Sequence, residues 1–446
     1  MMKFMLNMLN SSRVYLVGKL TQMLFMFLLL FSGCSDQLSE DFQMEMNKSS
    51  DVIPMEEALA KLDAQMKIFY GDPTKGELPR KYDHTSVSAL TKYDLGISAT
   101  KGFSLDFPDS LLYLINFDGD NGYAVLPAAR SIDNGVFCIT EGGNISSDDF
   151  VSAFEVLKNG GNGTGIASSD KLLIVPELIL SELILELEYG VKIEDENVDE
   201  TKSAPAGTLY GPYLKTKWGQ ASIHGTRVWN RYTPNHALAG CVVTATAQIM
   251  VYNKHNNTNM YDGVVCDFQG MESVYHYSTL GFAEDTTYYD QVAHFVRELG
   301  NHNQCRITYG SSEGAESSGY AEGAQRALQY YGYNDVDKHL GFGRRKQKIA
   351  TKVIRKGRPV YLDGATDFLD HGLNTTGHAW VLDGECGEYY HINWGWNGYS
   401  DGYFKKGTFS TTDRYSVDDL VDTATQQVSA QNYTWDYRLV TYGDWN

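Results

Sequence analysis

The spacing of apolar and polar residues along the chain predicts a mixed α+β structure. Over residues 55–70, apolar side chains recur at helical spacing, at Ala58, Leu59, Leu62, Met66 and Phe69. Two apolar runs, 111–117 and 123–126, flank the turn-forming segment from Asp118 to Gly122, and this pattern predicts a β-hairpin. Helical spacing returns over 148–157 and 176–189. We expect the second of these helices to begin near Pro176, because a proline in the first turn gives up no hydrogen bond.

The pattern changes between residues 191 and 208. This stretch is acidic at first, then rich in small residues, and it has little apolar surface to bury. Such a composition is typical of an exposed linker, and exposed linkers are where proteases cut. With 446 residues the chain is long enough for two domains. We therefore expect a smaller α+β domain over 52–190, a linker with a processing site, and a larger α+β domain over 209–446.

The larger domain begins with a helical pattern and continues with strands. Apolar residues at positions 242, 245, 249 and 252 fall on one face of a helix, and Gly240 suits the turn that enters it. Strand patterns bounded by glycine or proline follow over 358–364, 377–384 and 389–398.

The N-terminus has the features of an export signal. Positive residues precede an apolar run over 23–31, which is too short to span a bilayer comfortably. Ser32, Gly33 and Cys34 follow, and this arrangement resembles a bacterial lipobox. The resemblance implies a signal peptide over 1–33, lipidation of Cys34 and a flexible tether over 34–51. We expect an outer membrane lipoprotein that faces the periplasm or the cell surface. The alternative is ordinary secretion with Cys34 incidental.

Composition excludes several classes of function. A net charge of −19 argues against nucleic acid as a partner. The histidines and cysteines show no metal-ligand spacing, and there is no glycine loop for a phosphate, so we expect no metal and no cofactor. Whether Cys138, Cys266, Cys305 and Cys386 form disulfides stays open.

Three segments carry candidate chemistry. Cys241 lies at the predicted start of a helix, where the helix dipole and free N–H groups stabilise a thiolate. His378 lies on a predicted strand and is the candidate base, and Asn393, one hairpin further on, is the candidate that orients its ring. Trp394 or Trp396 would shield that contact from water.

These segments together resemble the streptopain-like cysteine proteases of the papain-like group. The resemblance rests on Gly240-Cys241 with the helix after it, on 377–381, and on Asn393-Trp394-Gly395-Trp396. It implies a papain-like domain, in which a cysteine at a helix start packs against an antiparallel sheet that carries the histidine and the asparagine. Cys241 would be the nucleophile, His378 the general base and acid, and Asn393 the orienting residue with Trp394 beside it.

The resemblance also extends to two flanking regions. Gln220, in Trp218-Gly219-Gln220, matches the glutamine of the oxyanion hole, although the Pro-Tyr-Asn run that usually follows is absent here. Residues 52–190 resemble the inhibitory propeptide of that family more loosely, through the predicted hairpin.

We therefore expect a secreted, lipid-anchored cysteine endopeptidase that is made as a zymogen. Its partners would be polypeptide substrates, its own propeptide and, through the anchor alone, a membrane. Two alternatives remain: a different Cys–His enzyme such as an amidase or an acyltransferase, and a binding lipoprotein that keeps the protease fold.

Overall fold

A computed structural model describes residues 51–71, 86–97, 108–132, 135–158, 171–189, 207–276, 286–365, 377–409 and 436–443. By internal contacts the chain divides after Val52, and every element discussed below belongs to the second unit, Ile53–Asn446. The expected signal peptide, the lipidation site Cys34 and most of the 191–208 linker lie outside the described residues.

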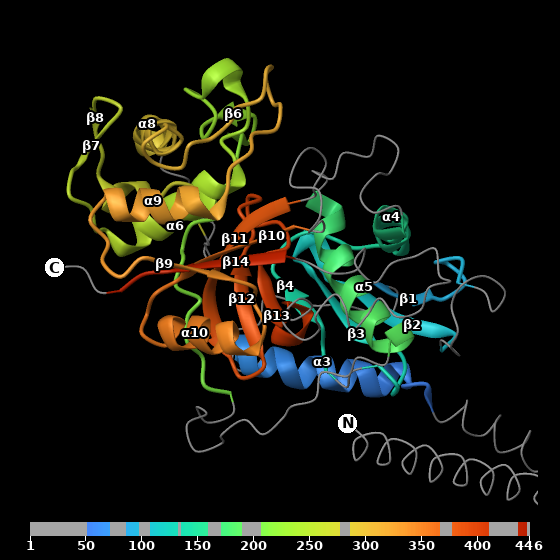
Figure 1. The fold of residues 1–446 in the computed structure, drawn as a ribbon. Helices are drawn as coiled ribbons and strands as arrows, with labels where there is room; N and C mark the ends of the chain where they lie inside the picture. Colours follow the sequence, from blue (N-terminus) through green and yellow to red (C-terminus); the bar gives the residue numbers. More distant parts are fainter. Residues whose placement is uncertain are drawn as a thin grey trace, which may run out of the picture. The chain divides into compact units, whose positions relative to one another are not determined.

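The second unit is built around a ten-stranded sheet in which each strand is antiparallel to its neighbours (Figure 1). In spatial order the strands are β1 (Val87–Thr91), β2 (Ser110–Asn116), β3 (Tyr123–Pro127), β4 (Cys138–Thr140), β13 (Gly402–Lys405), β12 (Tyr389–Asn393), β11 (Gly377–Cys386), β10 (Val360–Ala365), β14 (Asp436–Thr441) and β9 (Asp337–Leu340). With the helices on its faces, this sheet confirms the expected α+β class.

The elements expected before the linker are present. Helix α3 (Met55–Tyr70) buries the five apolar residues that its pattern singled out, and β2 and β3 form the hairpin. Helix α4 (Ser147–Lys158) covers the next predicted helix. The start of α5 (Lys171–Tyr189) was predicted wrongly, because Pro176 lies inside the helix. Its missing N–H therefore leaves one carbonyl of the preceding turn without its usual helical partner.

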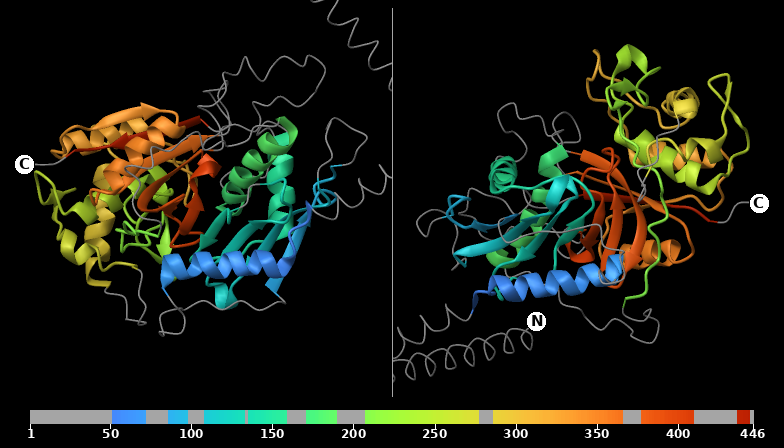
Figure 2. Two further views of the ribbon diagram at one scale, coloured as in Figure 1. Left: turned by 90° about the horizontal axis from the view of Figure 1, so that it is seen from below. Right: turned by 180° about the vertical axis from the view of Figure 1, so that it is seen from behind.

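One sheet joins the two sides of the linker. Strand β4 pairs with β13 through Thr140 opposite Gly402, Ile139 opposite Tyr403 and Cys138 opposite Phe404. Figure 2 shows the same arrangement from two further directions, with the strands of the two regions side by side and α3 running along both. The domain boundaries proposed from the sequence stay predictions.

Helix α6 (Cys241–Asn253) is the central helix of the region after the linker. It packs against β10 and β11, and against α7 (Phe268–Met271), α8 (Tyr289–Leu299) and α9 (Ala321–Tyr330). Every residue from Val242 to Val251 is buried, including Thr244, Thr246 and Gln248. The predicted helix is therefore confirmed, and because it is buried along this length, its polar residues also face protein groups.

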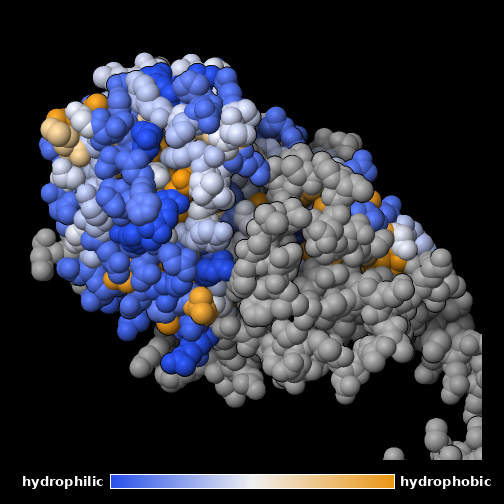
Figure 3. All heavy atoms as spheres, turned by 45° about the horizontal axis from the view of Figure 1, so that its top comes forward, coloured by the Kyte–Doolittle hydropathy of each residue, from blue (hydrophilic) through white to orange (hydrophobic). Residues whose placement is uncertain are grey.

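Smaller elements complete this region. Helix α10 (Arg344–Ile354) packs against β10, β11 and β14, and two short hairpins are formed by β5 (Ser222–Ile223) with β6 (Thr226–Arg227) and by β7 (Met260–Tyr261) with β8 (Val264–Val265). On the face seen in Figure 3 the described surface is mostly hydrophilic, and apolar residues occur singly or in small groups. Across the described ranges, no helix combines the length and apolarity that a membrane crossing requires.

Candidate active site

Cys241 is the first residue of α6, as the sequence predicts. Gly240 precedes it with φ of +93°, a backbone conformation that side chains rarely adopt, and this turn directs the chain into the helix. The sulfur lies close to the backbone of Ala379 on β11, the residue that directly follows His378. The fold thus brings the two candidate catalytic segments together.

His378 is almost buried, with 6% of its surface exposed, and it lies among three indole rings. Its Nε2 atom is 2.7 Å from the backbone oxygen of Trp394, so this nitrogen donates a hydrogen bond to the carbonyl. The ring of Trp396 is nearest, with a centroid distance of 4.6 Å, while those of Trp380 and Trp394 both lie at 6.2 Å. The imidazole is therefore held in one orientation by a carbonyl and by aromatic packing.

Burial disfavours a thiolate at Cys241 in this arrangement. Burial raises the pKa of the Cys241 thiol to about 11, even though the backbone N–H groups near the sulfur act to lower it, and Asp363 raises it further. The Nε2 bond to the Trp394 carbonyl leaves the other ring nitrogen of His378, Nδ1, as the candidate base. The thiolate–imidazolium pair stays a prediction.

The expected bond between Asn393 and His378 is absent. Asn393 donates from Nδ2 to the carbonyl of Thr216 at 2.9 Å, and its Oδ1 accepts from Gln248 at 2.9 Å and from the backbone N–H of Gly395 at 3.1 Å. In the sheet Asn393 lies opposite Val381, three residues beyond His378. The group that holds the histidine ring here is the Trp394 carbonyl, a backbone atom of the next residue.

Gln220 lies beside the start of α6. Its backbone oxygen accepts from the N–H of Ala239 at 2.9 Å, two residues before the cysteine. The hydroxyl of Thr244 donates to the oxygen of Gly219 at 3.2 Å, which fastens the same segment to the first turn of the helix. The structure therefore brings Gln220 to the nucleophile, and its role as an oxyanion donor stays a prediction.

Sequence reasoning missed two buried residues that support the site. Gln248 links three segments, since its Oε1 accepts from the Thr216 hydroxyl at 2.8 Å and from the Trp218 N–H at 3.1 Å while its amide bonds Asn393. Asp401 accepts from the backbone N–H of Trp394 at 2.8 Å and is fully buried. A glutamine inside an otherwise apolar helix was the available signal for Gln248, because buried polar groups are almost always bonded.

The described residues contain no group of three or more His, Cys, Asp or Glu side chains arranged to hold a metal ion. The five cysteines in the described ranges, Cys138, Cys241, Cys266, Cys305 and Cys386, are all free thiols.

Comparison with known proteins places this site in a family. Residues 218–404 match the sequence model of the Peptidase C10 family, and the match contains Gln220, Cys241, His378 and Asn393. Residues 218–404 belong to the peptidase C10 family. The chain is also 27% identical to streptopain of Streptococcus pyogenes serotypes M1 and M28, over 257 aligned residues. That alignment covers 49% of this chain and 62% of the length of the curated relatives.

Two solved structures also align with this chain. A prointerpain A fragment of Prevotella intermedia aligns over 77% of this chain and 99% of its own length, with a TM-score of 0.47 and 18% identity. Active interpain A of the same organism aligns over 53% of this chain and 96% of its own length, with a TM-score of 0.34 and 21% identity.

Proposed function

We propose that this chain is a cysteine endopeptidase made as a latent precursor. The observation that carries the proposal is the position of Cys241, at the start of a buried helix with its sulfur against the residue after His378, inside a C10 region. This arrangement supports Cys241 as the nucleophile, His378 as the base and Gln220 as the amide donor. Peptide bonds are the substrate class that the family name supports.

In the active state, Nδ1 of His378 takes the proton of Cys241, while Nε2 keeps its bond to the Trp394 carbonyl, which orients the ring. The thiolate attacks the peptide carbonyl, and the Gln220 amide together with the Cys241 N–H stabilises the oxyanion. His378 then protonates the leaving amine, and water hydrolyses the thioester with the same histidine as base. No step of this sequence requires a cofactor.

Latency follows from the arrangement described above. A thiol with a pKa of about 11 is almost wholly protonated at neutral pH, and burial is the main cause of this raised pKa. A shift of residues 52–190, after a cut within 191–208, is the step that would lower it. The protein would be exported and anchored at the outer membrane through a lipid on Cys34.

The test compares the purified wild-type precursor with Cys241→Ser under reducing conditions. We expect the wild type to cleave casein and to convert itself to a shorter form, and the variant to stay full length and inactive. A wild type that hydrolyses muropeptides or incorporates amines, and leaves casein intact, would overturn the endopeptidase proposal in favour of an amidase or an acyltransferase. Labelled palmitate that enters the wild type but not Cys34→Ser would support the anchor.

A further inference from the structure

We call the described residues between 51 and 189 the N-terminal region. This region contacts the C10 region through strand pairing in the shared sheet. Strand β4 occupies the edge of β13, with three residue pairs in register. Around this ladder the Tyr123 hydroxyl lies 3.0 Å from that of Ser400, and the backbone N–H of Ser400 donates to the oxygen of Gly142 at 2.9 Å. If the N-terminal region left, β13 would become an open edge with unpaired backbone groups, which is a costly state for a sheet.

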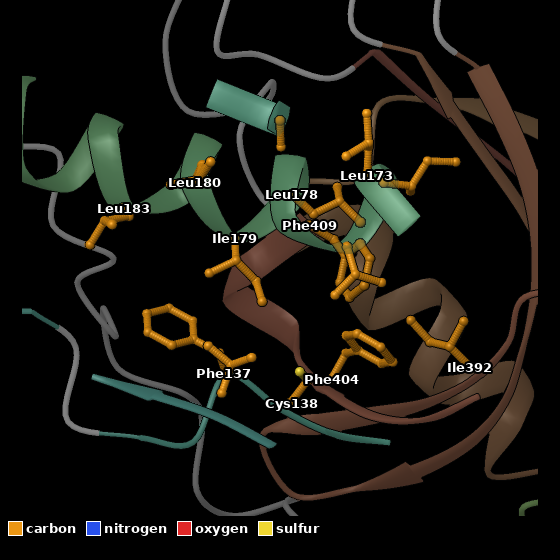
Figure 4. Close-up of a cluster of buried hydrophobic side chains, with 14 of the residues drawn as sticks. Phe137, Cys138, Leu173, Leu178, Ile179, Leu180, Leu183, Ile392, Phe404 and Phe409 are labelled. Atoms are coloured by element: carbon orange, nitrogen blue, oxygen red, sulfur yellow. The ribbon is translucent and has the colours of Figure 1, made fainter. Parts of the chain in front are cut away.

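Apolar side chains of the N-terminal region also cover both faces of β12 and β13. On one face, Leu178 and Ile179 of α5 and Phe137 join a core cluster that contains Ile392, Phe404 and Phe409 (Figure 4). On the other face, Phe69 of α3 stacks on Tyr403 at a centroid distance of 3.9 Å and meets Tyr389 edge-on at 5.0 Å. These residues are buried to the same degree as an ordinary domain core, and obligate interfaces have this character.

A buried charge cluster crosses the same boundary. His391 on β12 is fully buried, and its Nδ1 lies 2.6 Å from a carboxylate oxygen of Asp383. Its Nε2 lies 3.7 Å from the carboxylate of Glu141, which comes directly after β4. Burial alone would lower the pKa of His391, but the two carboxylates outweigh it and raise the pKa to about 10. Glu141 of the N-terminal region therefore supplies part of the counter-charge for a buried cation of the C10 region.

We propose that a cut in the linker does not release the N-terminal region, which stays bound to the C10 region as the second chain of a non-covalent particle. Three kinds of interaction cross the boundary together: a strand ladder, two apolar faces and a buried charge cluster. Loss of the whole set exposes apolar surface and leaves His391 with an incomplete set of partners, and both effects oppose dissociation. The proposal depends on the proposed function only for the natural occurrence of the cut.

The experiment introduces the cut independently of any activity of the chain. The full chain carries Cys241→Ala and, in place of part of 191–206, the recognition sequence of an unrelated protease. After complete cleavage, native mass spectrometry and size-exclusion chromatography at about micromolar concentration measure whether the two pieces stay together. We expect one particle with the mass of both pieces, which separates only in denaturant. Two species that elute independently without denaturant would overturn the proposal.

Matched variants then test the charge cluster. Glu141→Gln removes the charge of one of the two carboxylates beside His391, while Glu56→Gln makes the same change at an exposed position of α3. On the cut particle we expect Glu141→Gln to raise the dissociation constant by roughly tenfold or more, and Glu56→Gln to leave it unchanged. Equal constants for the two variants would refute a holding role for Glu141. Thermal unfolding of the uncut variants establishes that both are folded. Because Cys241→Ala is inactive by design, neither result depends on whether the chain is a protease.

Discussion

Alkylation of Cys241 gives a direct measure of latency. At pH 7.5 a thiol with a pKa of about 11 is ionised in roughly one molecule in 3,000, whereas an ordinary thiol of pKa about 8.5 is ionised in about one in ten. The ionised fraction of Cys241 is thus about 300-fold smaller than that of the ordinary thiol. A more basic thiolate is about 10- to 20-fold more nucleophilic, which offsets part of this difference. We expect Cys241 of the precursor to react with iodoacetamide about 20-fold more slowly than an exposed reference thiol.

The pH dependence separates this explanation from simple steric protection. Between pH 7.5 and 9.5 the rate at Cys241 should rise about 100-fold, because the pKa lies above this range, while the reference thiol rises only about tenfold. The assay uses the full chain with Cys34→Ser, and peptide mapping assigns the label to Cys241. A rate that levels off below pH 9 would refute the raised pKa.

His378→Ala is the matched control for the same assay. In the precursor the thiol pKa is raised mainly by burial, so removal of the imidazole should change the precursor rate by less than about threefold. In the processed enzyme the same change should abolish fast labelling at neutral pH, since the ion pair then depends on the imidazole. A precursor rate that falls tenfold on substitution would show that His378 already activates the thiol.

Three further predictions concern the surroundings of the site. Gln220→Ala should lower the kcat of the processed enzyme about 100-fold with little change in KM, and an unchanged kcat for a short peptide would exclude it from the oxyanion hole. Gly240→Ala should destabilise the chain by roughly 1–3 kcal/mol, measured by urea unfolding, because its φ of +93° strains any side chain although no atom lies closer than 3.6 Å to the new Cβ. His391 has a folded pKa above its unfolded value, so its contribution to stability is complete below about pH 6.5 and is lost as the pH rises through about 10. The difference in free energy of unfolding between wild type and His391→Gln should therefore shrink with rising pH, and a constant difference would contradict the paired charge.

The fold was predictable wherever local pattern decides structure. The apolar spacing of α3 and the turn between β2 and β3 are local signals, and the structure confirms both elements. The start of α5 was not predictable in this way, because packing in the shared core stabilises a turn before Pro176 that local propensity disfavours. In α6 the apolar spacing predicted the helix, but not the burial of Gln248, which partners far along the chain satisfy.

Within the site, the sequence indicated which residues meet but not how they bond. The sequence pattern indicated Cys241 and His378, the family resemblance added Gln220, and the structure brings their segments together. The bond that holds the histidine ring goes to a backbone carbonyl, and every residue has one, so no residue type could have marked Trp394 for this role. The residue type of Asn393 suggested that it orients the histidine. In the structure its amide group instead forms hydrogen bonds with Thr216 and Gln248.

The backbone contact at Trp394 also connects the orientation of His378 with the N-terminal region. The carbonyl that holds His378 belongs to a residue whose N–H is fixed by Asp401, and the backbone oxygen of Asp401 accepts from the N–H of Glu141 at 2.5 Å. Each of these contacts is short and buried or nearly so, and the path ends in the region before the linker. Because the Trp394 carbonyl orients the ring of His378, the contact at Glu141 bears on the chemistry without touching it. A cut in the linker alone changes none of these atoms. The N-terminal region therefore helps to fix the orientation of the histidine for as long as it stays bound.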